Sequence, residues 1–226
     1  MDARWRLRTL AGILTLAIAG IGCNPFNLAY FLTGGPEPKI PPEFPLADPR
    51  HEITVLLLPY CSADVQTDHL GIDRQLGTTL TRQLQERCQA NREKVKIVPM
   101  HRVEKFKSEH PSWKSMGAAE IGRHFQADYV IDMEVISFGL YEPGSHRTLF
   151  KGRCKIDLAV LDLARPQDGP VFKKAFSSEY PRTRGPVPVA DDNNTDKFRD
   201  MFIQRIATDL SWLFTTHYSS EEYQCD

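Results

Sequence analysis

The feature that most constrains the fold of this chain is a short, almost continuous apolar run, ITVLLLPY, over residues 53–60. A strand with one solvent-facing side alternates apolar and polar residues, whereas an unbroken apolar run is typical of a strand buried on both faces. Such strands belong to sheets that are covered by helices. The run therefore predicts a domain in which helices pack on a sheet, and that domain should begin near residue 52.

Periodicity and turn residues place the other elements. Residues 68–91 carry apolar side chains every four positions, which predicts a helix. Further helices are expected over 101–109, 117–126 and 196–217, and further strands over 95–98, 128–138, 150–160 and 171–180. This order predicts a single α/β domain with a mixed sheet, helices packed on it, a three-strand antiparallel meander and a C-terminal amphipathic helix.

The first 22 residues have the order of an export signal. Three arginines within residues 4–8 precede an apolar run over residues 10–22, and small residues come last. The run is shorter than the roughly 20 residues that a membrane-spanning helix needs. We therefore expect residues 1–22 to direct export.

A single cysteine, Cys23, closes this run. Its position resembles the lipidation site of bacterial lipoproteins, where signal cleavage leaves an amino-terminal cysteine that carries diacylglycerol and a fatty acid such as palmitate. That family prefers Leu, Val or Ile three places before the cysteine, whereas this chain has Gly20 there. Two alternatives stay open, namely cleavage after Ala19 and an uncleaved anchor.

The lipoprotein resemblance also implies a location. A lipid on Cys23 would hold the protein to a membrane of the cell envelope, facing the periplasm. Asn24 follows the cysteine, and it is not the Asp that marks retention in the inner membrane, so the resemblance favours the outer membrane.

A proline-rich stretch follows, PEPKIPPEFPLADP over residues 36–49, and its six prolines exclude a helix or a central strand. We expect a semi-rigid spacer of about 40 Å, or otherwise a disordered leader. The predicted organisation is an export signal over 1–22, a lipidated cysteine and proline-rich tether over 23–51, an α/β periplasmic domain over 52–218 and a flexible tail over 219–226.

Motifs of catalysis and of metal binding do not occur in the sequence. It contains no G-x-S-x-G, no glycine-rich phosphate loop and no HExxH, and none of the seven histidines pairs with a cysteine at metal-ligand spacing. The acidic stretch 190–196, ADDNNTD, fits the start of a helix better than a calcium loop. We therefore expect no enzymatic activity, no cofactor and no metal. The net charge of -1 gives no bulk attraction for nucleic acid.

Two other functions are compatible with the sequence. An exported hydrolase would have to assemble its residues from separate positions, for example Ser62, Asp64 and His69. A domain that binds a small ligand or a lipid would need a sizeable apolar cavity.

The remaining cysteines are expected to have structural roles. Cys61 ends a strand and Cys88 ends the helix that runs back antiparallel to it, so the two lie too far apart for a disulfide. Cys154 falls on the apolar face of its strand and is expected to be a buried thiol, while Cys225 belongs to the tail.

Three stretches together resemble a group of periplasmic lipoprotein domains: ITVLLLPY over 53–60, LGTTLTRQLQE over 76–86 and AAEIGRHFQADYVIDMEV over 118–135. The group comprises the curli-secretion lipoprotein, the outer-membrane activators of penicillin-binding proteins and the amino-terminal domain of the Tol translocation protein. Its A-x-x-I-G-x-x-x-x-A-D-Y-V-I unit is matched by Ala118 or Ala119, Ile121, Gly122 and residues 127–131. Two positions differ, since Tyr60 replaces a usual Phe and Met133 a common Gly.

This second resemblance covers about residues 52–165 and rests on structural motifs. It implies that Gly122 allows close packing between helix and sheet. It further implies a non-catalytic interaction or assembly module that binds an envelope protein or associates with itself.

Overall fold

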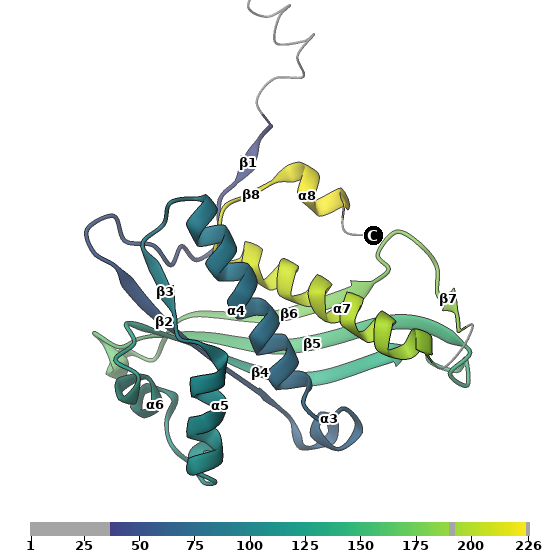
Figure 1. Cartoon of the computed structure of the whole chain (residues 1–226), viewed down its shortest axis with the longest axis horizontal. Helices are drawn as coiled ribbons and strands as arrows, with labels where there is room; N and C mark the ends of the chain where they lie inside the picture. The colour runs from purple at the N-terminus through teal and green to yellow at the C-terminus, as the bar shows by residue number, and fades with distance from the viewer. Residues whose placement is uncertain (1–36, 190–192, 225–226) are drawn as a thin grey trace, which may run out of the picture. The chain divides into compact units, whose positions relative to one another are not determined.

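The apolar run forms strand β2 (Ile53–Cys61), which lies inside a mixed sheet. In the computed structural model, which describes residues 37–189 and 193–224, β2 pairs in parallel with β3 (Val95–Ile97) and with β4 (Tyr129–Tyr141) (Figure 1). Leu56 and Leu57 are successive residues that point to opposite faces, and both are fully buried. The prediction of a strand covered on both faces is confirmed.

The second half of the sheet is an antiparallel meander. β5 (Leu149–Asp162) follows β4 and β6 (Pro170–Tyr180) follows β5, each antiparallel to the strand before it. The strand order is β3-β2-β4-β5-β6, and the two-residue β7 (Val187–Pro188) pairs with the first residues of β5. The predicted α/β fold with a mixed sheet and a three-strand meander is confirmed.

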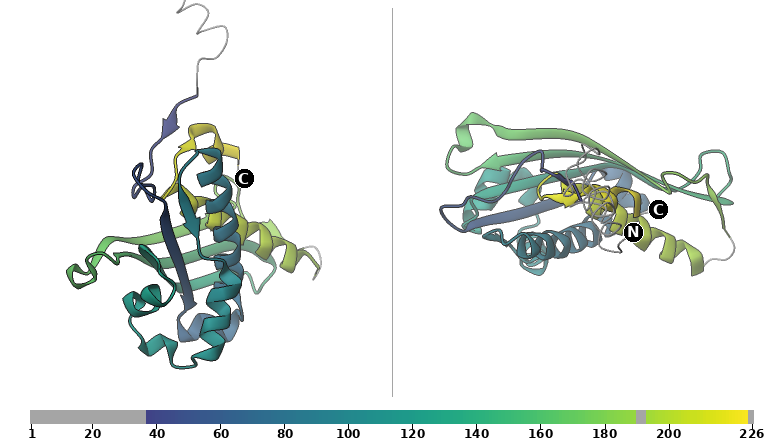
Figure 2. Two further views of the ribbon diagram at one scale, coloured as in Figure 1. Left: turned by 60° about the vertical axis from the view of Figure 1, so that its left-hand side comes forward. Right: turned by 90° about the horizontal axis from the view of Figure 1, so that it is seen from above.

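Two long helices cover one face of the sheet. α4 (Ile72–Ala90) packs over β2, and α7 (Asn193–Trp212) lies beside α4 and over the meander (Figures 1 and 2). The helix expected over 68–91 is α4, which begins only at Ile72 because Gly71 before it has a φ of 81°. A left-handed residue of this kind cannot continue a helix. A short helix that was not expected, α3 (Ala63–Asp68), precedes it.

Shorter helices form the connection from β3 to β4. These are α5 (Met100–Glu109), the 3₁₀ turn Trp113–Ser115 and α6 (Ala118–His124). A second 3₁₀ turn, Pro166–Asp168, joins β5 to β6. Within the described part of the chain, no helix is both long and apolar enough to cross a membrane.

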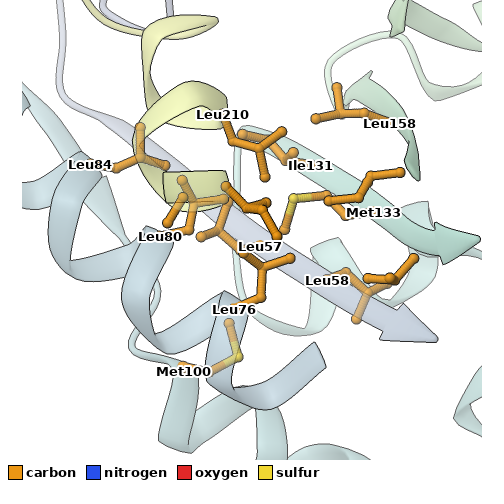
Figure 3. Packing of buried hydrophobic residues seen from close by; sticks show 14 of the residues in the cluster. Leu57, Leu58, Leu76, Leu80, Leu84, Met100, Ile131, Met133, Leu158 and Leu210 are labelled. Atoms are coloured by element: carbon orange, nitrogen blue, oxygen red, sulfur yellow. The ribbon is translucent and has the colours of Figure 1, made fainter. Parts of the chain in front are cut away.

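The main core lies between the sheet and the two long helices (Figure 3). Leu57 and Met133 from neighbouring strands meet Leu76 and Leu80 of α4 and Leu210 of α7, and all five are at most 1% exposed. At roughly 1.5–3 kcal/mol for each fully buried aliphatic side chain, this layer is a main source of the stability of the domain.

Gly122 of α6 shows how closely the opposite face of the sheet is approached. A Cβ atom at this position would lie 2.4 Å from Cγ2 of Val130 and 2.6 Å from Cδ1 of Leu163. Real Cβ atoms do not come this near to other atoms, so the packing of α6 on β4 requires glycine. The role that the sequence resemblance implied for Gly122 is confirmed.

Part of the proline-rich stretch belongs to the domain. β1 (Lys39–Ile40) pairs antiparallel with β8 (His217–Tyr218), and Leu46 is 1% exposed. Phe44 packs edge-on against Tyr129 at 5.7 Å, and its amide donates to the carbonyl of Leu213. Residues 39–46 therefore contribute to the core and do not act as a free spacer, because Leu46 is buried in the core and Phe44 packs against it.

The C-terminal end also departs from expectation. α7 ends at Trp212, and the residues after it form β8 and α8 (Ser219–Gln224), where a continuing helix and then a flexible tail were predicted. His217, which was expected to end the helix, lies in β8 and pairs with Ile40.

Cys61, Cys88 and Cys154 are buried free thiols, as predicted. Burial raises their pKa to about 11 for Cys61 and about 12 for the other two, so all three are kept as thiols at neutral pH. The predicted export signal, Cys23, the first part of the tether and Cys225 lie outside the described residues.

Candidate functional site

The two faces of the meander differ in character. Ile131, Met133 and Val135 of β4 point toward α4 and α7 and are fully buried. The residues between them, Asp132 and Glu134, point to the other face and are only partly buried. α6 packs on this outer face near the start of β4, and the rest of the outer face carries a hollow lined by carboxylates.

The strand register sets the side chains of the hollow in two rows. Tyr60, Glu134, Asp157 and Ala175 lie side by side on β2, β4, β5 and β6. The next row contains Leu58, Asp132, Ala159 and Lys173 on the same four strands. The two alanines are too short to fill the surface between their longer neighbours, which leaves a hollow of about 400 Å³.

The negative charges of the hollow are close enough to affect one another. Burial, and then the charge of Glu134, raise the pKa of Asp132 from 3.8 to about 6. Burial also raises the pKa of the Tyr60 phenol to about 12, and the charges of Asp132, Glu134 and Asp157 add to this effect. The hollow is therefore lined by three carboxylates, with Lys173 and Lys174 also in its lining.

This arrangement suits a cationic, hydrogen-bond-donating group. Carboxylates accept hydrogen bonds from lysine and arginine, and a guanidinium group can bridge two carboxylate oxygens. Within residues 37–189 and 193–224, no group of three or more His, Cys, Asp or Glu side chains is placed to hold a metal ion. The lining is charged, so the hollow is not the apolar cavity that a lipid-binding domain would need.

The residues named for a hydrolase do not converge. Ser62 precedes α3, and its hydroxyl donates to the carbonyl of Ile136 at 3.3 Å. The His69 ring packs edge-on against Phe138 at 5.0 Å, and burial lowers its pKa. Asp64 is exposed in the first turn of α3. No hydrogen bond of the described region joins any two of these three side chains.

A second polar cluster is buried where α7 meets β6. The Asp209 carboxylate accepts hydrogen bonds from the Ser178 hydroxyl at 3.0 Å and from Nη2 of Arg182 at 2.9 Å. It also forms an ion pair with Nε of Arg205 at 3.0 Å, and the side chains of this pair are only 2% and 3% exposed. Asp209 lines a cleft together with His217, whose Nε2 lies 3.2 Å from Glu222.

Neither group was expected from the sequence, although the sequence contains a signal for each. Asp132 and Glu134 alternate with apolar residues in a strand, which places both on one face of β4. Arg205 and Asp209 are one helical turn apart and border the apolar stripe of α7. Cys23, the predicted lipid attachment residue, lies outside the described residues.

No protein-family model and no curated protein matches the chain. Among solved structures, the fold is similar to the lipoprotein GNA1162 from Neisseria meningitidis, with 10% identity and a TM-score of 0.43 over 69% of this chain and 99% of that one. It is also similar to the PelC dodecamer from Paraburkholderia phytofirmans, with 12% identity and a TM-score of 0.42 over 80% and 97%.

A third similar structure is a minor lipoprotein from Acinetobacter baumannii, with 10% identity and a TM-score of 0.34 over 70% of this chain and 88% of that one. Two of these three proteins are thus named lipoproteins. None of the three names identifies the curli-secretion, penicillin-binding-protein activator or Tol group, so the resemblance to that group stays a prediction. The similarities identify neither a ligand nor a reaction.

Proposed function

We propose that this chain is a lipid-anchored protein of the bacterial cell envelope whose α/β domain binds a protein partner and has no catalytic role. The observation that carries the proposal is the acidic hollow on the outer face of the meander. Its carboxylates stand on adjacent strands of a rigid sheet, and we propose that they receive lysine or arginine side chains of an envelope protein.

The electrostatics of the hollow support a cationic partner. Asp132 and Glu134 repel each other, and Glu134 lies directly opposite Asp157 on the neighbouring strand. A bound ammonium or guanidinium group would relieve both repulsions. Part of the binding free energy would therefore come from removing the repulsion between carboxylates that is present in the free domain.

The membrane anchor is supported by the sequence. An arginine-rich start, an apolar run and small residues lead directly to Cys23. Triple acylation of this cysteine would anchor the chain firmly, since each buried methylene contributes about 0.8 kcal/mol.

Metabolic labelling tests the anchor. The full chain and its Cys23→Ser variant would be produced in a bacterium that is fed an alkyne fatty acid, and the label would then be detected on the protein. We expect label on the wild type and none on the variant. Absence of label from the wild type would show that the chain is exported or anchored without lipid.

Site-directed crosslinking tests the partner surface. A photoreactive amino acid at Ala159, on β5 in the floor of the hollow, is expected to crosslink an envelope protein in intact cells. A matched probe at Thr78, exposed on α4 on the opposite side of the sheet, serves as the control. The crosslink should disappear when Glu134→Gln and Asp157→Asn remove two charges, and a crosslink that survives both changes contradicts an electrostatic partner site.

A further inference from the structure

β6 is the last strand in the sheet order β3-β2-β4-β5-β6 (Figure 1). It is 11 residues long, against the five or six of a common strand, and it pairs with β5 along one edge. No strand of the described residues pairs with its other edge, because β7 pairs with β5. An edge strand of this length presents a row of backbone donors and acceptors to any strand that fits.

We propose that the outer edge of β6 pairs antiparallel with β6 of a second copy of this chain, about a two-fold axis at Phe176. Each residue before Phe176 then faces the residue at the same distance after Phe176 in the other copy. This inference goes beyond the proposed function and does not depend on it, since it concerns the backbone edge of β6 and needs neither the lipid nor the cationic partner.

Charge complementarity selects this register. It sets Lys173 opposite Glu179 of the other copy, and the symmetry makes this pair twice. Both side chains are exposed and both lie on the outer face of the sheet, where Val171, Ala175 and Ser177 also point. Opposite charges on directly facing residues stabilise a strand pair.

Side-chain size agrees with the charges. Between the two ion pairs, Ala175 faces Ser177, so no bulky side chain of the outer face keeps the backbones apart. On the inner face the half-buried Phe172 meets Tyr180, and this aromatic pair is also made twice. Aromatic cross-strand pairs favour sheet association.

Neighbouring registers lose these pairs. Two residues that face each other across the strand pair must point to the same face of the sheet. In two identical strands such residues are an even number of positions apart, so the two-fold axis passes through a residue and not between two residues. An axis at Ala175 sets Lys174 opposite Phe176, and an axis at Ser177 sets Lys174 opposite Tyr180. An axis at Lys173 or Lys174 sets a lysine opposite its own copy, which is repulsive.

Glu179 has room for the new partner. Within its own chain it lies 3.6 Å from Nε of Arg153 and 3.7 Å from Nζ of Lys151, both at the long end for ion pairs, and its side chain remains 55% exposed. Lys173 stands at the rim of the acidic hollow. The dimer would therefore place two acidic hollows on one face of a continuous sheet, on either side of the two-fold axis.

Disulfide crosslinking tests the register directly. In the full chain with Cys225→Ser, the double variant Ala175→Cys, Ser177→Cys puts facing cysteines about 4.5–5.5 Å apart between Cα atoms, within the range of a disulfide. We expect a covalent dimer of the double variant on mild oxidation in cells. Either single variant is the matched control, because its cysteine faces the native Ser177 or Ala175, and it should remain monomeric under denaturing conditions.

A charge exchange tests the energetics. Sedimentation equilibrium of the full chain in excess nonionic detergent micelles should show dimers, and Lys173→Glu or Glu179→Lys should each weaken association by about tenfold, because two pairs become repulsive. The double exchange should restore association to within about threefold of the wild type, with circular dichroism confirming that every variant is folded.

Three results would contradict the pairing of β6 with β6 of a second copy. A monomeric wild type at tens of micromolar, equal crosslinking by the single variants, or no recovery in the double exchange would overturn the proposal. The proposed function is judged separately, because Glu179→Lys lies outside the hollow and leaves Cys23 labelling unchanged, and the neutralised hollow, Glu134→Gln with Asp157→Asn, leaves the dimer intact.

Discussion

Glu134 on β4 lies directly opposite Asp157 on β5, so two carboxylates face each other across the outer side of the sheet. Like charges in this position destabilise a strand pair. The stability of the sheet does not require this pair. Pairs that lower stability occur mainly at functional sites, so the pair indicates a functional surface.

Removing one charge of this pair should stabilise the domain. Glu134→Gln is expected to raise the free energy of unfolding by about 0.5 kcal/mol in low salt, as measured by urea denaturation. The gain should shrink in 1 M NaCl, where exposed charges are screened. Lys155→Gln, a charge change on the same face of β5 opposite Ser137 and Ser177, is the control and should have no such effect. A loss of stability in Glu134→Gln would show that the carboxylate is structurally required.

Asp132 should make stability depend on pH. Its pKa in the folded domain is about 6, above the ordinary value of 3.8, so between these values the folded state holds a proton that the unfolded chain releases. Stability from this group is therefore complete below about pH 4 and is lost as the pH rises through 6. Asp132→Asn should stabilise the domain by up to about 2 kcal/mol at pH 7.5 and by almost nothing at pH 4.

Urea denaturation of wild type and Asp132→Asn across this range measures the difference. An NMR titration of the Asp132 carboxyl carbon provides an independent check on the same group. An equal effect of the substitution at both pH values would contradict the raised pKa.

Asp209 should be among the most sensitive polar positions. Asp209→Ala leaves the buried Arg205 guanidinium without its counter-charge, and we expect a loss of about 3–5 kcal/mol in the free energy of unfolding. The matched control is the exposed pair of Arg82 and Glu86, also one helical turn apart, whose side chains are 55% and 61% exposed. Glu86→Ala should change stability by less than about 1 kcal/mol.

A double variant separates charge from packing at this site. Arg205→Met with Asp209→Leu removes both charges and keeps apolar volume, so it should lose much less stability than Asp209→Ala alone. Equal losses in the two variants would mean that the pair acts through shape and not through charge.

Leu46 tests whether the proline-rich stretch belongs to the fold. Leu46→Ala removes a side chain that is 1% exposed and should cost about 2–4 kcal/mol in the free energy of unfolding. Leu70→Ala makes the same chemical change at a position that is 87% exposed and should leave stability nearly unchanged. If Leu46→Ala left the free energy of unfolding unchanged, residues 39–46 would be part of the tether and not of the fold.

Local sequence patterns predicted the central strands well. β2 was expected from its run of apolar residues, because burial on both faces leaves a signal within a few consecutive residues. α3 was not expected, and the start of α4 was placed before Ile72, since it depends on the left-handed backbone of Gly71. β1 and β8 were missed because each is two residues long and its partner lies at the other end of the domain.

The acidic hollow could not be predicted because it depends on register. Glu134 and Asp157 face each other only for one alignment of β4 and β5, and a shift by one residue would turn one of them to the opposite face. The hollow also needs Ala159 and Ala175, whose small size matters only beside longer neighbours. Each of these residues can be read from the sequence, but the sequence does not show that they lie side by side on neighbouring strands.

The pairing of β1 with β8 has a mechanical consequence. A pull on the chain from its N-terminal side reaches the domain first through this two-residue ladder, and then through Phe44 and Leu46 beneath the sheet. Few backbone bonds resist at that point, while the ladder of β5 with β6 runs the length of β6. Tension would therefore detach residues 39–46 first and lengthen the chain. The sheet would unfold only at a higher force.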